Sequence, residues 1–92
     1  MKKFVIEREI NGVGSLCGDE LKAAAAKSNA ALAELSPRVQ WLESFVTDDR
    51  TFCIYLADNI HAVGEHARLS GFPANRVFEV TRTIDPSTAV TG

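Results

Sequence analysis

The 92-residue sequence has little of what several classes of protein require, and each shortage argues against one class. Lys and Arg total 10 against 12 Asp and Glu, so the formal net charge is −2. The basic excess of a domain that binds DNA or RNA is therefore missing. No stretch approaches the roughly 20 consecutive apolar residues of a membrane-spanning helix. We expect neither a nucleic acid nor a membrane as a partner.

Cysteine is also scarce. Cys17 and Cys53 lie far apart and form no Cys-x-x-Cys pair. Free thiols in a reduced, cytoplasmic protein are the simplest interpretation, with a single disulfide as the alternative. Lys2 and Lys3 are followed by Phe-Val-Ile-Glu-Arg-Glu rather than by a long apolar region. We therefore expect no signal peptide.

The most informative stretch runs from Val39 to Ala57. It contains two apolar, alternating runs that are rich in β-branched and aromatic residues, separated by Asp48-Asp49-Arg50. Such side chains favour the pleated, half-buried surface of a strand, and aspartates favour turns. The stretch predicts a β-hairpin.

Four further elements follow from periodicity and from helix-ending or strand-ending residues. They are a strand over Phe4–Ile10, a helix over Gly18–Leu35, a helix over Asn59–Ser70 capped by Asp58, and a strand over Val77–Ile84. The order β-α-β-β-α-β predicts an α+β, ferredoxin-like fold as one domain over residues 1–92, with a loose tail at about 87–92. Both helices should cover one face of a four-stranded antiparallel sheet whose first and third strands are central.

Alternation along the strands divides the sheet into two faces. We place under the helices Phe4, Ile6, Leu42, Val46, Phe52, Ile54, Leu56, Phe78 and Val80. The open face then carries Val5, Glu7, Trp41, Glu43, Phe45, Cys53, Tyr55, Val77 and Glu79. Its aromatic residues exceed what a solvated face needs, which predicts a homodimer packed sheet to sheet; a monomer with exposed aromatics is the alternative. Glu7 and Glu79 should lie at the rim, solvated or paired with Arg8 or Arg82 of a neighbour.

Several blocks of the sequence resemble one small bacterial family. They lie at residues 4–9, 39–49, 53–55, 65–76 and 84–86, and Glu-His-Ala-Arg-Leu-Ser-Gly-Phe-Pro within the fourth block is the most specific. The family is a former domain of unknown function in which a member is described as nickel-responsive and nickel-binding. The resemblance implies a dimeric ferredoxin-like fold, a cytoplasmic location and nickel sequestration, for storage or detoxification.

The second predicted helix carries the residue types that nickel accepts as ligands. His61 and Glu65 are four apart and share a face, with Asp58 three residues before His61. His66 is five residues from His61 and lies on a different side. Either Asp58, His61 and Glu65 form a surface site, or His66 acts separately with groups from the sheet or a second subunit. The alternative is a solvated polar face, with His66 hydrogen-bonded to a backbone carbonyl.

A different class of function is also open. The fold could serve as a cofactor-free enzyme or small-molecule binder with a pocket between sheet and helices. Trp41, Tyr55 and His66 would line that pocket, and Tyr55 or His66 would transfer protons. Gly12-Val13-Gly14 does not complete a dinucleotide-binding motif, because Cys17 stands where the third glycine belongs.

Overall fold

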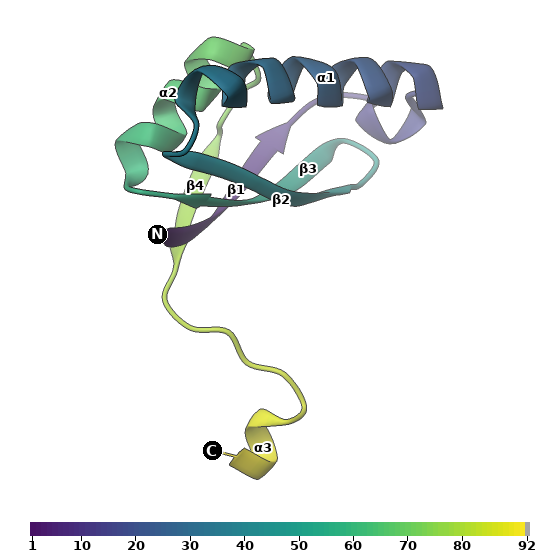
Figure 1. The fold of residues 1–92 in the computed structure, drawn as a ribbon. Helices are drawn as coiled ribbons and strands as arrows, with labels where there is room; N and C mark the ends of the chain where they lie inside the picture. Colours follow the sequence, from purple (N-terminus) through teal and green to yellow (C-terminus); the bar gives the residue numbers. More distant parts are fainter. Residues whose placement is uncertain (92) are drawn as a thin grey trace.

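The computed structural model describes residues 1–91, and its core is one antiparallel sheet covered on one face by two helices (Figure 1). The elements are β1 Lys2–Glu9, a 3₁₀ turn η1 Val13–Ser15, α1 Gly18–Leu35, β2 Val39–Val46, β3 Arg50–Ala57, α2 Ile60–Ser70, β4 Arg76–Val80 and α3 Thr88–Thr91. The strand order is β2-β3-β1-β4, so the first and third strands are central, as predicted. The α+β ferredoxin-like fold is confirmed. In residues 1–91 no helix combines the length and apolar character needed to cross a bilayer.

The two covering helices begin and end where local chemistry allows. The bounds of α1 are those predicted, and Glu20 accepts a hydrogen bond from the Cys17 N–H at 3.2 Å at its start. α2 begins one residue later than predicted, because Asn59 rather than Asp58 caps it and accepts from the Ala62 N–H at 3.0 Å. Gly71 ends α2 with a φ of 75°, a left-handed conformation that glycine adopts without strain.

The predicted faces are correct for β1 but wrong for β3 and β4. Phe4 lies opposite Tyr55, and Ile6 lies opposite both Cys53 and Val77. Directly opposed residues share a face, so the side chains at 53, 55 and 77 lie under the helices. The covered core contains Phe4, Ile6, Leu35, Val39, Cys53, Tyr55, Ala57, Ala62 and Val63.

The open face therefore differs from the predicted one. By register it carries the apolar side chains Val5, Phe45, Phe52, Ile54, Leu56, Phe78 and Val80. A bulge between Trp41 and Glu43 changes the alternation in β2: it puts Trp41 under the helices opposite Tyr55 and leaves Leu42 exposed. Glu79, opposite Phe4, also belongs to the helix side, at the edge of the sheet.

The acidic residues near the sheet edge pair within the chain. Glu7 is buried rather than solvated at a rim, and its Oε2 lies 2.7 Å from Nη1 of Arg50. Arg76 approaches the same carboxylate at 3.9 Å. Glu79 is exposed and lies 3.5 Å from Lys2. Within the chain these carboxylates therefore pair with Arg50, Arg76 and Lys2, and a pairing with Arg8 or Arg82 of a neighbouring chain stays a prediction.

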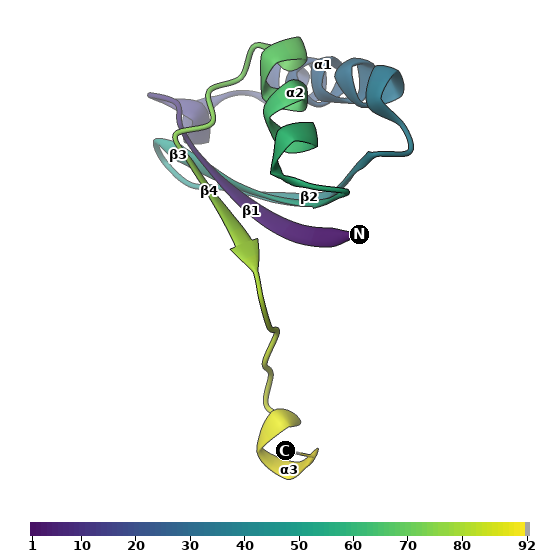
Figure 2. The same cartoon turned by 90° about the vertical axis from the view of Figure 1, so that its left-hand side faces the viewer.

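The last strand is shorter than predicted. β4 ends at Val80, which lies opposite Lys3, one residue from the start of β1 at Lys2. The chain from Thr81 then runs away from the sheet on the side opposite the helices (Figures 1 and 2). It ends in α3, where a loose tail was expected; Gly92 lies outside the described residues.

Candidate functional site

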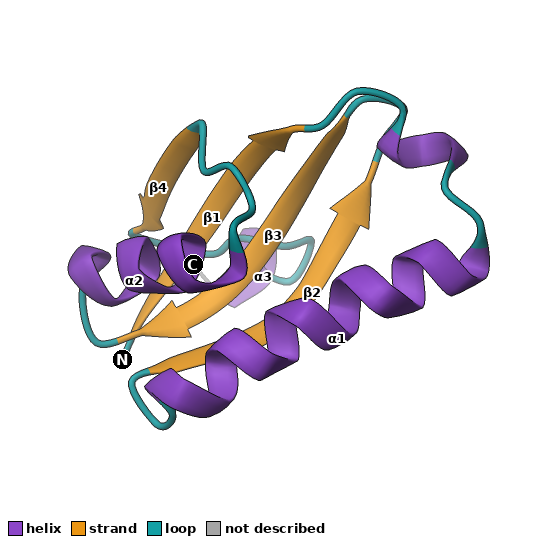
Figure 3. Ribbon diagram, turned by 90° about the horizontal axis from the view of Figure 1, so that it is seen from above, coloured by secondary structure: helices purple, strands orange, loops and turns teal. Residues whose placement is uncertain are grey.

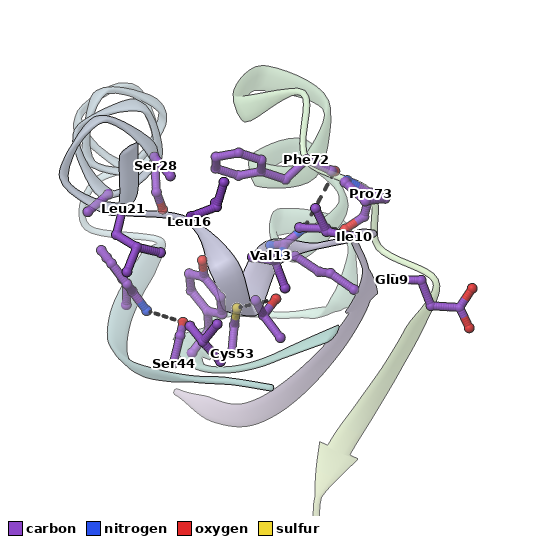
Figure 4. A pocket seen from close by; sticks show the side chains of 17 residues that line it. Glu9, Ile10, Val13, Leu16, Leu21, Ser28, Ser44, Cys53, Phe72 and Pro73 are labelled. Carbon is purple, nitrogen blue, oxygen red and sulfur yellow. Dashed lines mark hydrogen bonds between the residues drawn. The ribbon is translucent and has the colours of Figure 1, made fainter. Parts of the chain in front are cut away.

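A pocket of about 470 Å³ lies between the N-terminal half of α1, η1 and the helix-covered face of the sheet (Figure 4). The lining is mostly apolar: Arg8, Glu9, Ile10, Val13, Leu16, Leu21, Ala24, Ala25, Ser28, Trp41, Ser44, Val46, Thr51, Cys53, Tyr55, Phe72 and Pro73. Figure 4 shows Phe72 reaching toward Ser28, with Cys53 and Ser44 on the opposite, sheet side. The volume and the apolar lining are typical of small-molecule sites.

The pocket exists because α1 presents small side chains over that part of the sheet. Ala24 and Ala25 line the pocket, whereas Leu35, at the C-terminal end of the same helix, is buried in the core. Leu21 lines the pocket and is 38% exposed, since nothing in the described chain packs fully against it. The hollow is thus encoded by alanines at inward helical positions.

The wall formed by η1 is fixed to the tip of the β2–β3 hairpin. The Gly14 N–H donates to the carbonyl oxygen of Asp48 at 2.9 Å. A Cβ at Gly14 would lie 2.6 Å from the carbonyl oxygen of Thr47, so only glycine permits this approach. The contact positions Val13 and Leu16 against the pocket (Figure 4).

The only charged side chain buried at this site among residues 1–91 is Arg8, which is 2% exposed. Its Nη1 donates to the carbonyl oxygen of Pro73 at 2.6 Å, and its guanidinium carbon lies 5.8 Å from the centre of the Phe72 ring. Its Nη2 has no hydrogen-bond partner within residues 1–91. From the sequence, Arg8 is expected as a possible partner of a glutamate and not as a pocket residue. A charged residue at an inward position of a central strand was the available signal.

A polar cluster stands beside Arg8. Ser28 Oγ lies 3.1 Å from His66 Nε2, and the rings of His66 and Tyr55 are 4.9 Å apart between centroids. Burial lowers the pKa of His66, helped by the positive charge of Arg8 and partly opposed by hydrogen bonding to Ser28. Burial also raises the pKa of Tyr55, partly offset by Ser28 and Arg8. Near neutral pH both rings are therefore uncharged, and Arg8 alone carries charge.

Of the three residues assigned to a pocket from the sequence, two line the pocket and the third lies behind its wall. Trp41 and Tyr55 line the pocket, and Trp41 Nε1 donates to Ser44 Oγ at 2.9 Å. His66 is fully buried and lies behind Ser28 rather than in the lining. Its partner is a side-chain hydroxyl, whereas a backbone carbonyl was expected.

The four candidate metal ligands are not brought together. Asp58 and His61 are exposed, and His66 is buried on the other side of α2. Glu65 forms two hydrogen bonds with Arg68, at 2.6 and 3.2 Å, and this contact lowers the pKa of Glu65. Among residues 1–91, no three His, Cys, Asp or Glu side chains lie close enough to hold one metal ion. The predicted nickel ligands thus lie apart from one another within one chain.

Both cysteines are free thiols. Cys17 is exposed at the start of α1, and Cys53 is buried on β3 with its Sγ 3.6 Å from Thr51 Oγ1. The alternative of a disulfide between them is therefore wrong. Cys53 lines the pocket as a small, mostly apolar side chain.

The fold has a solved counterpart. The crystal structure of SCO4226 from Streptomyces coelicolor A3(2) matches with a TM-score of 0.75 over 89% of this chain and 99% of the other, at 16% sequence identity. At that identity the match demonstrates the fold alone. No curated protein matches the chain. The model of one family, described as nickel responsive protein SCO4226-like, matches residues 4–80. Because that match covers most of the sequence, this chain belongs to the SCO4226-like family.

Proposed function

We propose that this chain binds a small, largely apolar molecule in the pocket beneath the N-terminal half of α1. The observation that carries the proposal is the pocket itself, about 470 Å³ in a chain of 92 residues. A pocket of this size with a mostly apolar lining is typical of a small-molecule site. An occupant would cover apolar side chains that the chain leaves open, such as Leu21 and Val46.

The proposal is tested with N-phenyl-1-naphthylamine, a neutral apolar dye whose fluorescence rises on transfer from water. We expect saturable binding to the native chain and at least tenfold weaker binding to Ala24→Phe, because the new ring would fill the pocket. Ala26→Phe is the matched control, since Ala26 lies on the exposed side of the same helix and outside the pocket lining. Absence of saturable binding, or equal binding by Ala24→Phe, would overturn the proposal.

Family membership favours nickel binding as a second candidate. Asp58, His61 and Glu65 would hold the ion, with a second copy of the chain completing the ligand set. The exposed imidazole of His61 supports this, as does the carboxylate of Asp58 nearby in sequence. Glu65 would have to leave Arg68, and His66 would contribute only if α2 moved, because it is fully buried.

Calorimetric titration of the tag-free protein with nickel tests this second candidate. We expect one saturable site that His61→Ala abolishes. His66→Gln is the control, because His66 is buried, and it should retain binding. A titration with no saturable heat, or one that His61→Ala leaves unchanged, would exclude nickel binding at His61.

We also propose that the chain is a homodimer packed sheet to sheet. Support comes from the open face, where Phe45 and Phe78 are 55% and 52% exposed and Ile54 lies among them. A contiguous apolar surface of this kind usually marks an interface. The two free thiols support our further proposal that the protein works in the reducing cytoplasm.

Sedimentation velocity tests the dimer. The native chain should sediment at twice the chain mass, and Phe78→Glu should sediment as single chains, because a carboxylate would be buried without a partner. Val90→Glu, a change at an exposed residue of α3, is the control and should leave the dimer intact if only the sheet faces meet. Single chains of native protein at working concentration would exclude the dimer.

A further inference from the structure

The strongest unexplained feature of the molecule is the buried charge of Arg8. Its side chain is 2% exposed on central strand β1 and lines the pocket. Burial of a charge is costly unless a countercharge or hydrogen bonds replace the lost water. One end of the guanidinium is held by the carbonyl oxygen of Pro73, but Nη2 has no partner within residues 1–91. A fixed donor is therefore left unused at the pocket wall.

No acidic side chain neutralises Arg8 in the described chain. None of the ion pairs within 4.0 Å in residues 1–91 includes it. Glu7 and Glu9, its neighbours in sequence, point to the other face of the sheet and pair with Arg50. Figure 4 shows the Glu9 carboxylate directed away from the pocket. The countercharge has to come from outside this part of the chain.

The surroundings of Arg8 add positive potential and no negative charge. His66 and Tyr55 are neutral near pH 7, for the reasons given above. The Lys27 ammonium lies 5.3 Å from the centre of the same Phe72 ring that Arg8 approaches from 5.8 Å. The polar end of the pocket thus carries one buried positive charge, with a second cation near its edge. The remaining walls are mostly apolar.

We propose that the pocket takes a small carboxylic acid with an apolar body, whose carboxylate accepts a hydrogen bond from Arg8 Nη2. This inference rests on the proposed pocket function and names its ligand class. A guanidinium suits a carboxylate in both geometry and charge, and the single buried charge favours a monoanion. The apolar body lies among Val13, Leu16 and Leu21, opposite Trp41. Ser28 and Tyr55, beside Arg8, offer hydroxyl groups to the second carboxylate oxygen.

The test compares 2-naphthoate with 2-naphthamide, which share a ring system and differ in charge. Binding of each to the full native chain is followed by intrinsic tryptophan fluorescence, since Trp41 lines the pocket. We expect naphthoate to bind at least tenfold more tightly than naphthamide. Arg8→Met should remove that preference, while the amide binds as before. Arg82→Met, beyond the end of β4, is the matched control and should keep the native preference.

The possible outcomes separate the two proposals. Equal binding of acid and amide by the native chain overturns the anionic ligand class and leaves the pocket function standing. A preference for the acid that survives Arg8→Met overturns the role of Arg8. Saturable binding of neither compound overturns both. The comparison of acid with amide on the native chain needs no variant, so it decides the ligand class even if Arg8→Met fails to fold.

Discussion

The space between the helices and the sheet has two unlike ends. Under α2, Phe4, Ile6 and Val63 are fully buried and belong to one core cluster. Under the N-terminal half of α1, alanines leave the pocket. The two helices take different paths over the sheet: α1 runs along β2, whereas α2 lies beside α1 and contacts β3 and β2 (Figure 3). The difference indicates that stability is concentrated at the packed end, and that the hollow end is free to serve binding.

Truncating one side chain at each end should give the largest difference in the free energy of unfolding. Ile6→Ala removes a fully buried side chain, and we expect the free energy of unfolding to fall by about 2–5 kcal/mol. Leu21→Ala at the hollow end should cost about 1 kcal/mol or less, because Leu21 is already partly in water. Urea unfolding followed by circular dichroism measures both. Similar losses at the two positions would contradict a division into packed and hollow ends.

Larger side chains at the two ends should also differ in their effect on stability, by a smaller amount than the truncations. Ala62→Leu adds volume where α2 meets the core and should destabilise the chain by about 1–3 kcal/mol. Ala24→Leu adds the same atoms at the pocket and should be close to neutral, since there is room. Thermal unfolding separates them, because 1 kcal/mol corresponds to about 4–8 °C in a domain of this size. If Ala24→Leu lowered the melting temperature and Ala62→Leu did not, the prediction would be wrong. The pocket would then have no room for the added atoms.

The order of the four strands and the two covering helices was predictable because these elements carry strong local signals. The helix over Gly18–Leu35 has an alanine-rich, periodic sequence, and Ser36-Pro37 ends it. The faces of β3 were not predictable from alternation, since both of its sets are apolar: Phe52, Ile54 and Leu56 against Cys53, Tyr55 and Ala57. Where both faces of a strand are apolar, hydrophobicity does not distinguish them. Only the register against Phe4 and Ile6 does so.

The site was harder to predict than the fold. Trp41 and Tyr55 were proposed together for a pocket, but on alternation they had been placed on the open face. The bulge beside Trp41 leaves no signature that alternation alone would reveal. The sequence offers Arg8 only as a possible partner of Glu7 or Glu79, because charged side chains are ordinarily expected at the surface. Its unpartnered Nη2 becomes visible only when the surrounding elements are in place.

The smallest predicted effect concerns His66, which stands between the two ends. Burial lowers the pKa of His66 in the folded chain. Below about pH 6.5, the unfolded chain therefore binds a proton at His66 more readily than the folded chain does. Stability from this group is complete above about pH 6.5 and falls as the pH drops below it, by at most about 1.4 kcal/mol per pH unit. Urea unfolding between pH 7.5 and 5.5 measures the slope.

The two histidines of α2 give this prediction a matched control. His66→Gln should flatten the slope, because the variant has no buried imidazole to protonate, whereas His61→Gln should keep the native slope, since His61 is exposed. Parallel profiles for the native chain and His66→Gln would mean that His66 takes up protons as readily folded as unfolded. Water would then reach the His66 ring from the pocket. Ser28 and His66 would in that case belong to the hollow end and not to the packed end.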